Sequence, residues 1–376
     1  MPKKIKILHI QETIASGGVE RVKLSLAKHL DKRKFDQKFV CTIAAGNIPD
    51  EIRAEGFEVI PIGQLKSPFD WQYHKKVQKI IEDYQPDIIH GAVFEGVTMA
   101  AVNGWFKKVP VIIIEETSFP IYRSWKAHLL MQMFSKMATK VIGVSPAVSE
   151  EYLKGKLKLS NNKVVLINNG VALPRAVTTL ELQAAKNHWG FKEEDFVIGS
   201  VGRMLDDSNK RFSDLIRAFA EFAKGRDEVK LLLVGDGPER QSYEVLSKDL
   251  GVADQVLFAG YQSDVSLFYQ MMDVFSLVST HESFGLVLAE AMLNKLPILA
   301  TKVGGMKYIV ENDITGLHVE TKNVADITRK IEFLYQNPSV RTRMGNEGFQ
   351  KAMREYTEDS YVKKIHELYY SLVSKP

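Results

Sequence analysis

The chain has 376 residues, of which 45% are hydrophobic and 26% are charged, and its formal net charge is +4. This balance is typical of a folded protein of about two domains and excludes a disordered or fibrous chain. No stretch approaches the run of about 20 apolar residues that crosses a bilayer. The first residues enter a strand pattern at once, so we expect no signal peptide. The single cysteine, Cys41, excludes an internal disulfide and fits a cytoplasmic protein.

The charge is distributed unevenly along the chain. Residues 1–170 hold 25 Lys and Arg against 17 Asp and Glu, whereas residues 171–376 hold 25 against 29. We therefore expect the two halves to meet different partners. No basic run is interleaved with aromatics in the manner of a surface that stacks bases, so nucleic acid is not expected. An anionic membrane surface or a phosphate-bearing acceptor fits the basic half better.

Short apolar strands alternate with amphipathic helical patterns through the first half of the chain, with helices such as those at 19–30 and 71–84. This alternation is typical of parallel βαβ units. The predicted strands are Ile5–Ile10, Gln37–Thr42, Glu58–Ile62, Ile88–His90, Val111–Ile114, Val141–Val144 and Val164–Ile167.

The second half repeats the plan after a turn-rich hinge at residues 168–174. Its predicted strands are Val197–Val201, Lys230–Val234, Val256–Phe258, Val274–Val278, Ile298–Ala300 and Gly316–Val319. We predict an α/β protein of two Rossmann-like domains, at residues 1–172 and 173–355, rather than one barrel. The remaining segment, 356–376, forms a helix that is expected to pack back on the first domain.

Two carboxylates, Glu282 and Glu290, bracket an apolar run that follows the predicted strand at 274–278. The run from Phe284 to Leu293 predicts a helix, so Glu282 falls on a strand-to-helix loop at the carboxyl edge of the sheet, where ligands bind. The free N–H groups of a helix start beside a carboxylate suit a ligand with hydroxyls and phosphate. Glu290 lies on an apolar helix and needs a hydrogen-bonding partner there, which a ligand is expected to supply.

Several motifs in register resemble glycosyltransferase family 4, whose members have the GT-B fold and retain anomeric configuration. They are Gly17-Gly18-Val19-Glu20-Arg21, Asn169-Gly170-Val171, Gly202-Arg203 with Lys210, Gly235-Asp236-Gly237-Pro238-Glu239, the segment from Glu282 to Glu290, Gly304-Gly305, and Asn312-Asp313-Ile314-Thr315-Gly316. The resemblance extends from Ile7 to about Tyr356. It implies an acceptor-binding first domain that faces a nucleotide-sugar-binding second domain across a cleft.

The resemblance implies that Arg203 and Lys210 hold the donor diphosphate. A guanidinium at a strand end can make paired hydrogen bonds to phosphate oxygens, and an ammonium adds a second positive charge. The loop between them leaves Arg211 as an alternative to Lys210. Gly17 and Gly18 lie between a strand and a helix, where glycine lets backbone N–H groups approach a phosphate.

The remaining donor contacts are also implied by the resemblance. Glu282 would bind hydroxyls of the transferred sugar, and Glu290 would bind the ribose hydroxyls. Tyr261 either bounds the base pocket or lies on its rim. Backbone N–H contacts to sugar or phosphate would come from Phe284, Gly285, Leu286 and Val287.

His90 is predicted to end its strand at the same edge. Many relatives carry His-x-His here, and Ala92 replaces the second histidine in this chain. His90 is therefore either a catalytic contact beside Glu282, Arg203 and Lys210, or a residue that only caps the strand. The loop carboxylates Glu95, Glu115 and Glu116 are candidate acceptor contacts, with the solvated alternative open for each.

The expected reaction is metal-independent hexosyl transfer in a cell-surface polysaccharide or glycolipid pathway. Front-face substitution, in which the leaving phosphate helps to deprotonate the acceptor, is the family's usual description. A carboxylate nucleophile is the other retaining route, but the first domain marks none. No Asp-x-Asp metal signature is evident, and no cofactor is expected beyond the donor. A UDP-sugar is the expected donor because UDP is commonest in the family, with a GDP-sugar as the alternative.

Two other functions are compatible with this architecture. A sugar-nucleotide epimerase would need acid and base carboxylates in the first domain, and a non-catalytic relative would bind a glycan or nucleotide without turnover. Residues 124–144 combine Trp125 and several apolar side chains with lysines, and Trp105-Phe106-Lys107-Lys108 forms a second such cluster. These segments are either core helices or a peripheral contact with an anionic membrane near a glycan or lipid-linked acceptor. We expect a cytoplasmic protein, on the inner face of the membrane if that contact exists.

Overall fold

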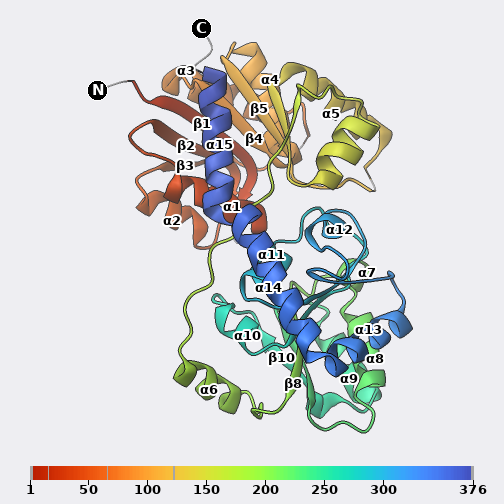
Figure 1. The fold of residues 1–376 in the computed structure, drawn as a ribbon. Coiled ribbons are helices and arrows are strands. Elements are labelled where there is room, and N and C mark those ends of the chain that lie inside the picture. The colour runs from red at the N-terminus through yellow and green to blue at the C-terminus, as the bar shows by residue number, and fades with distance from the viewer. Residues whose placement is uncertain (1–2, 16, 66, 122, 374–376) are drawn as a thin grey trace. The chain divides into compact units, whose positions relative to one another are not determined.

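The computed structural model describes residues 3–15, 17–65, 67–121 and 123–373. The chain forms two compact units (Figure 1). Unit 1 comprises residues 1–170 and 357–376, and unit 2 comprises residues 171–356. The boundaries predicted after residues 172 and 355 differ from these limits by two residues and one residue.

Unit 1 contains a seven-stranded parallel sheet in the order β3-β2-β1-β4-β5-β6-β7. The strands are apolar on both faces because helices cover a parallel sheet from both sides. The direction of chain progression reverses between β1 and β4. The strands are β1 Ile5–Ile14, β2 Phe35–Ala44, β3 Glu58–Pro61, β4 Ile88–Ala92, β5 Val111–Glu116, β6 Lys140–Gly143 and β7 Val164–Leu166.

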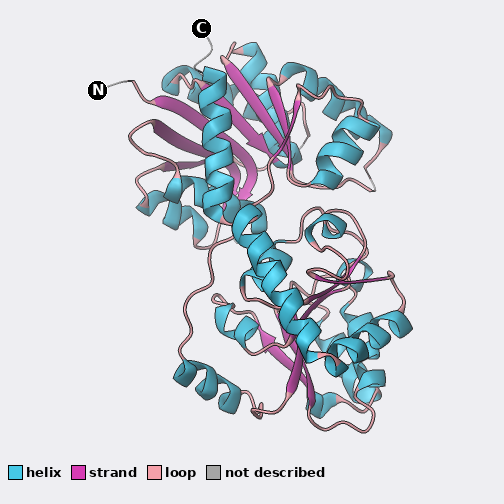
Figure 2. Cartoon of the chain, viewed as in Figure 1, coloured by secondary structure: helices cyan, strands magenta, loops and turns pink. Residues whose placement is uncertain are grey.

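Helices pack against the sheet of unit 1 (Figure 2). The C-terminal helix α15 belongs to this unit, where it contacts α1, and Ser25 donates a hydrogen bond to Glu358. The helices are α1 Gly18–His29, α2 Ile48–Ala54, α3 Trp71–Tyr84, α4 Val93–Phe106, α5 Trp125–Met137, the π-helix η1 Ala147–Lys156, and α15 Glu358–Val373.

Unit 2 contains a six-stranded parallel sheet in the order β10-β9-β8-β11-β12-β13, with its reversal between β8 and β11. Phe212, Leu215 and Phe219 lie in one hydrophobic cluster with Leu231 and Leu233 of β9. The strands are β8 Phe196–Val201, β9 Val229–Val234, β10 Val256–Gly260, β11 Val274–Leu277, β12 Ile298–Thr301 and β13 Gly316–Val319.

The helices of unit 2 connect these strands, and the last of them ends at Glu355. They are α6 Thr179–His188, α7 Asp207–Lys210, α8 Phe212–Phe222, α9 Arg240–Asp249, the short 3₁₀-helix η2 Ala253–Gln255, α10 Ser266–Gln270, α11 Leu286–Leu293, α12 Met306–Ile309, α13 Val324–Gln336 and α14 Pro338–Glu355. No helix in the described part of the chain is long and apolar enough to span a bilayer.

Among the predicted element ends that differ from the structure, two concern candidate site residues. The strand β4 continues beyond His90 to Ala92, because Gly91 and Ala92 still pair with Ile114 and Glu115 of β5. The helix α11 begins at Leu286 rather than at Phe284. Gly285 precedes it with φ +97°, a left-handed conformation that favours glycine and stops the helix from extending backward.

Candidate donor-binding site

The candidate site in unit 2 lies at the point where the strand order reverses. The loop that follows β8 carries Arg203 and Lys210, and the loop that follows β11 carries Glu282. Because β8 and β11 are parallel neighbours, their carboxyl ends meet at one edge of the sheet. In open α/β sheets the crevice at this reversal is where ligands bind.

The turn after β9 fixes the backbone around Arg203. Met204 N donates to Asp236 O at 2.9 Å. Gly235 has φ +136°, and a Cβ there would lie 2.0 Å from Gly202 O, so the two loops approach more closely than any larger residue permits. The Arg203 side chain is exposed and forms no ion pair or hydrogen bond with any residue that the structure describes. Its guanidinium is therefore available to a phosphate.

Lys210, at the end of α7, forms an ion pair with Glu282. The Nζ to Oε2 distance is 2.7 Å, and about a quarter of each side chain remains exposed, at 24% and 22%. Arg211, the alternative second cation, is engaged elsewhere. Its Nε and Nη2 lie 2.8 and 2.7 Å from the carboxylate of Asp214, and its Nη1 lies 3.4 Å from Asp207. Of the two cations, Lys210 is thus the one that faces the loop of Glu282.

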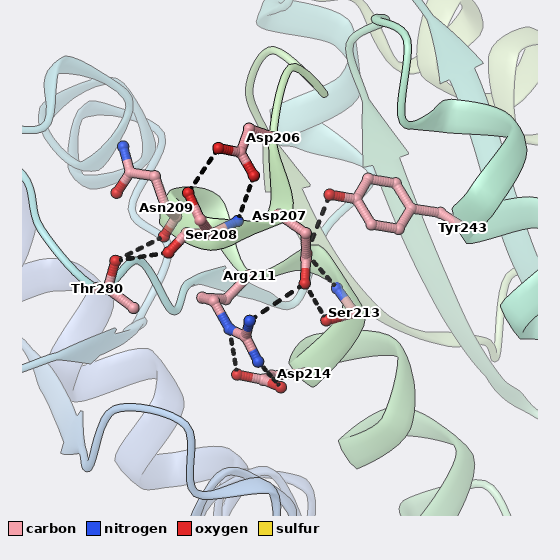
Figure 3. A network of polar contacts seen from close by, with 9 residues as sticks. All are labelled: Asp206, Asp207, Ser208, Asn209, Arg211, Ser213, Asp214, Tyr243 and Thr280. Atoms are coloured by element: carbon pink, nitrogen blue, oxygen red, sulfur yellow. Dashed lines mark hydrogen bonds and ion pairs between the residues drawn. The ribbon is translucent and has the colours of Figure 1, made fainter.

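The loop that carries Lys210 is held by Asp207 (Figure 3). The Asp207 carboxylate accepts hydrogen bonds from Ser213 N at 3.0 Å and from the hydroxyl of Tyr243 at 3.0 Å. Burial and the neighbouring Asp207 together raise the pKa of Tyr243 above its usual range, so this hydroxyl keeps its proton. Asp207 is therefore a structural feature of this loop.

Hydrogen bonds from Thr280 join the loop after β11 to the loop after β8. The Thr280 hydroxyl donates to Ser208 O at 2.9 Å and to Asn209 O at 3.5 Å (Figure 3), and Thr280 N donates to Asn209 O at 2.8 Å. These bonds flank Lys210 and Glu282 directly. The backbone next to Lys210 and the backbone next to Glu282 are therefore held to each other, and this fixes the position of the ion pair.

Gly304 and Gly305 make room for the loop of Glu282. Gly305 N donates to Glu282 O at 2.8 Å. A Cβ on Gly304 would lie 2.0 Å from Glu282 O, and one on Gly305 would lie 2.2 Å from Ser283 O. The motif Gly304-Gly305 therefore acts by close packing behind the carboxylate that the sugar is expected to meet.

The protein itself provides a partner for Glu290. The hydroxyl of Tyr269, which is 1% exposed, donates to Glu290 Oε2 at 2.8 Å. Burial and the adjacent carboxylate hold the pKa of Tyr269 well above its usual value. The expectation that a ligand must supply the partner of Glu290 is therefore wrong. Tyr269 lies 21 positions earlier on α10, and no sequence pattern singled it out.

The other predicted donor contacts of unit 2 surround this edge. Tyr261 follows β10 and is 65% exposed, and Gly260 before it has φ +67°. Phe284 is buried, and its ring packs edge-to-face on Tyr356 with centroids 5.6 Å apart. Leu286 and Val287 form the first turn of α11, where N–H groups lack intrahelical acceptors. A described residue that was not anticipated is Arg240, whose Nη2 lies 3.4 Å from Phe258 O at the end of β10.

The glycine turn of unit 1 is formed where it was predicted, between β1 and α1. Gly17 precedes the helix, and Gly18 begins it. The carboxylate of Glu20 folds over this turn, because Thr13 donates to Glu20 Oε1 at 2.9 Å and a Cβ on Gly17 would lie 2.3 Å from Oε2. A phosphate at this turn would meet that negative charge, whereas a hydroxyl could donate to it.

The predicted position of His90 at an accessible strand end is wrong. His90 is 0% exposed, with Nδ1 at 2.6 Å from the hydroxyl of Tyr369 and Nε2 at 3.0 Å from Glu115 Oε2. Lys23 Nζ lies 2.5 Å from the same carboxylate oxygen. The carboxylate of Glu115 thus lies next to Nε2, and the hydroxyl of Tyr369 lies next to Nδ1. A ring enclosed in this way cannot touch a sugar, so the alternative of a structural role holds.

Burial shapes the protonation of this cluster. It lowers the pKa of His90 to about 4, with Lys23 acting in the same direction. Burial alone would raise the pKa of Glu115, but Lys23 and His90 outweigh it and lower the pKa to about 2. Glu116 is also buried and pairs with Arg123 at 2.5 Å. Neither Glu115 nor Glu116 is therefore open to an acceptor.

Glu95 is the acceptor candidate that does line a cavity. The cavity, of about 170 Å³, lies beside the first turn of α4 at the strand-order reversal of unit 1 and is lined by Leu65, Ser67, Pro68, Phe94, Glu95 and Thr98. Burial and then the proximity of Glu95 raise the pKa of Glu12. Among the described residues, no group of three or more His, Cys, Asp or Glu is placed to hold a metal ion.

These two parallel-sheet units, each with its reversal point, have the GT-B fold, and the predicted fold class is confirmed. A model described as Glycosyl transferases group 1 matches residues 183–351, and one described as Glycosyltransferase Family 4 matches residues 16–175. The chain belongs to glycosyltransferase family 4, and it is a transferase enzyme.

Individual relatives extend this likeness over nearly the whole chain. An uncharacterized glycosyltransferase of Haemophilus influenzae is 27% identical over 94% of this chain and 95% of its own length. The alpha-monoglucosyldiacylglycerol synthase of Acholeplasma laidlawii is 24% identical over 88% and 86%. The structure of HepE from Anabaena in complex with UDP has a TM-score of 0.85, with 19% identity over 98% of this chain and 100% of that one.

Proposed function

We propose that this protein is a retaining glycosyltransferase that moves a hexosyl group from a UDP-sugar to a glycan or lipid-linked acceptor in cell-surface polysaccharide or glycolipid synthesis. The observation that carries the proposal is the Lys210–Glu282 ion pair, which shares the strand-order reversal of unit 2 with the unpaired side chain of Arg203. This set joins two cations for a diphosphate to a carboxylate for sugar hydroxyls. An epimerase would need an acid and a base carboxylate in the first domain. Glu115 and Glu116 of unit 1 are both buried, so they cannot serve as that pair.

The donor is gripped by charge and hydrogen bonds. Arg203 and Lys210 bind the diphosphate, and the N–H groups at the start of α11 add donors to phosphate or sugar. Glu290, held by Tyr269, accepts from the ribose hydroxyls. Tyr261 packs on the base. The complex of HepE with UDP supports UDP over GDP as the nucleotide.

The rate enhancement comes from stabilising the charge that develops on the leaving diphosphate. In front-face substitution the bond from the anomeric carbon to the phosphate oxygen breaks while the acceptor oxygen attacks from the same side. The acceptor proton passes to the departing phosphate. Two fixed cations, Arg203 and Lys210, neutralise that phosphate, so the reaction proceeds without a metal ion. Activity that disappears with a chelator and returns with a divalent ion would contradict this mechanism.

The acceptor is proposed to be a glycan or a lipid-linked sugar that binds to unit 1. The relative from Acholeplasma laidlawii is named as a diacylglycerol glycolipid synthase, which supports a lipid-linked acceptor. We place the protein in the cytoplasm, in peripheral contact with the anionic inner face of the cell membrane. The basic balance of residues 1–170 favours that contact electrostatically.

Calorimetric titration with UDP and GDP tests the donor site. The wild type is expected to bind UDP, and Arg203→Ala is expected to weaken the affinity about tenfold to a hundredfold, as for the loss of a charge-assisted phosphate contact. A matched control is Arg226→Ala, which removes an ion pair with Glu332 (2.9 Å) elsewhere in unit 2. An absence of heat with every nucleoside diphosphate, or equal affinities for the two variants, would refute the donor site.

A further inference from the structure

Unit 1 displays a cluster of exposed aromatic rings that neither the donor site nor the acceptor cavity uses. Trp71 and Phe106 lie 6.0 Å apart between ring centroids, and Phe106 lies 5.3 Å from Trp105. Phe69 stands two residues before Trp71. The four side chains are 51–55% exposed. Large aromatics gathered at the surface of one unit mark an interaction site, since single exposed apolar residues are ordinary but contiguous ones are not.

The cluster is carried by a rigid pair of helices. Trp71 begins α3, and Phe106 ends α4. The two helices are joined beneath the surface, where His74 Nδ1 lies 3.2 Å from the side-chain oxygen of Asn103 and Gln78 donates to the same oxygen at 3.1 Å. His74 and Asn103 are both buried. The rings are therefore held on a fixed support.

Exposed lysines lie on the same two helices as the rings or directly after them. Trp71, Lys75 and Lys79 are four residues apart, so they form one row on the solvent-facing side of α3. Lys108 follows the end of α4 and is also exposed. The side chains of Lys75, Lys79 and Lys108 make no ion pair or hydrogen bond within the described chain.

The same helix borders a groove with a lysine rim. The groove has a volume of about 450 Å³ between α3 and the edge strand β3. Its lining joins apolar side chains to Lys76, Lys79 and Asp83 of α3, Lys38 of β2 and Glu58 of β3. Lys38 pairs with Glu58 at 2.7 Å, and Lys76 donates to Ile62 O at 2.7 Å, so Lys79 is the cation of this rim that is left for an outside partner.

We propose that the α3 face, defined as Phe69, Trp71, Lys75, Lys79, Trp105, Phe106 and Lys108, rests on an anionic lipid bilayer. Aromatic rings prefer the boundary between headgroups and acyl chains, and unpaired lysines beside them attract anionic headgroups. The whole unit supports the attraction, with 28 Lys and Arg against 20 Asp and Glu. An acidic protein surface would match the lysines but would not require a cluster of exposed aromatic rings.

The α5 segment, which sequence patterns also offer as a membrane contact, is the weaker candidate. Trp125 and Leu129 are 71% and 57% exposed, and no ring contact joins Trp125 to another aromatic side chain of the described residues. The guanidinium of Arg123 is tied to Glu116 and to Tyr152. In the described part of the chain, this surface therefore offers less aromatic area and fewer unpaired cations than the α3 face. It supplies the comparison in the test.

This inference deepens the proposed function, because it names the surface that would hold the enzyme beside a lipid-linked acceptor. The test is co-sedimentation of the full chain with phosphatidylcholine vesicles and with vesicles that contain about 30% phosphatidylglycerol. The wild type is expected to bind the anionic vesicles, and about 1 M NaCl is expected to weaken that binding. Trp71→Ser/Phe106→Ser and Lys75→Glu/Lys79→Glu are each expected to weaken it about tenfold or more.

The matched control is Trp125→Ser/Leu129→Ser, for which binding within about threefold of the wild type is expected. Failure of the wild type to bind anionic vesicles overturns the inference, as does unchanged binding by both α3-face variants. Release of nucleoside diphosphate from a panel of UDP-sugars and GDP-sugars, by transfer or by hydrolysis, is measured with the same protein preparations. Vesicle binding that depends on the α3 face, without nucleoside diphosphate release, would contradict the proposed function alone. Nucleoside diphosphate release without such vesicle binding would contradict this inference alone.

Discussion

At the scale of single residues, the site contains cations that are available to the donor and cations that are engaged within the protein. Lys210 pairs with Glu282, whereas Arg211 beside it is fully engaged with Asp214 and Asp207. The sequence offers both cations as the second contact to the diphosphate but cannot choose between them, because the choice depends on which carboxylates fold nearby. Arg211 also has φ +55°, an uncommon backbone conformation for a residue other than glycine.

The Lys210–Glu282 pair predicts different kinetic effects for its two members. Glu282→Gln keeps the shape of the side chain but removes the charge that orients sugar hydroxyls, so kcat is expected to fall about 100-fold or more while UDP affinity changes little. Lys210→Met is expected to weaken UDP binding, because it removes a phosphate contact. Initial rates and calorimetry on both variants measure the split. If Glu282→Gln weakens UDP binding and leaves kcat unchanged, the assignment of Glu282 to the sugar is wrong.

At the scale of elements, the alternation of strands and helices is predictable because it is local periodicity. Contacts that join distant segments are not. His90 is enclosed by Tyr369, 279 residues later in the chain, and Glu290 is held by Tyr269 from α10. Both partners come from apolar stretches that a single sequence marks only as core. The positions of the glycine motifs, by contrast, are predictable from the sequence. The structure shows which backbone atoms lie close to each glycine.

The Gly304-Gly305 turn gives an element-scale prediction. In Gly305→Ala the added methyl would lie 2.2 Å from Ser283 O, so the loop of Glu282 must shift. We expect a loss of stability on the order of 1–3 kcal/mol and a fall in transfer activity. The control is Gly348→Ala in α14, where the nearest atom is Met292 Cγ at 3.3 Å and alanine favours the helix. Thermal melting and initial rates compare the two, and equal behaviour would contradict the packing role of Gly305.

At the scale of the whole molecule, the chain divides its charge between two units with similar sheets. Unit 1 is basic and carries the α3 face, and unit 2 carries the cations and carboxylates of the donor site. The composition of the two halves predicts this division. It does not predict that the C-terminal helix completes the interior of unit 1, where Tyr361, Ile365 and Tyr369 are buried to 1% exposure or less. That helix brings the hydroxyl of Tyr369 to 2.6 Å from His90 Nδ1.

The buried cluster in unit 1 makes the stability of that unit depend on pH. Unfolded histidine binds a proton below about pH 6.5, whereas folded His90, with its pKa lowered to about 4, stays neutral. The unfolded state therefore binds more protons between these values, and stability falls as the pH falls through this window. Glu115, with a pKa of about 2, extends the loss to lower pH as its pairing with Lys23 is titrated. The other titratable groups that face the cluster are His9, Tyr361 and Tyr369.

Hydrogen exchange of β4 and β5 peptides across pH 4–7 measures this dependence in the intact chain. The wild type is expected to lose on the order of 2–3 kcal/mol of protection toward the acidic end, and His90→Gln is expected to flatten the slope between about pH 4 and 6.5 because it removes the titrating ring. Tyr369→Phe, which deletes the hydroxyl at 2.6 Å from His90, is expected to lower protection at every pH by about 1–3 kcal/mol. The exposed Tyr370 provides the matched control, since Tyr370→Phe removes no buried partner. An unchanged slope in His90→Gln would show that the acid sensitivity of unit 1 arises outside this cluster.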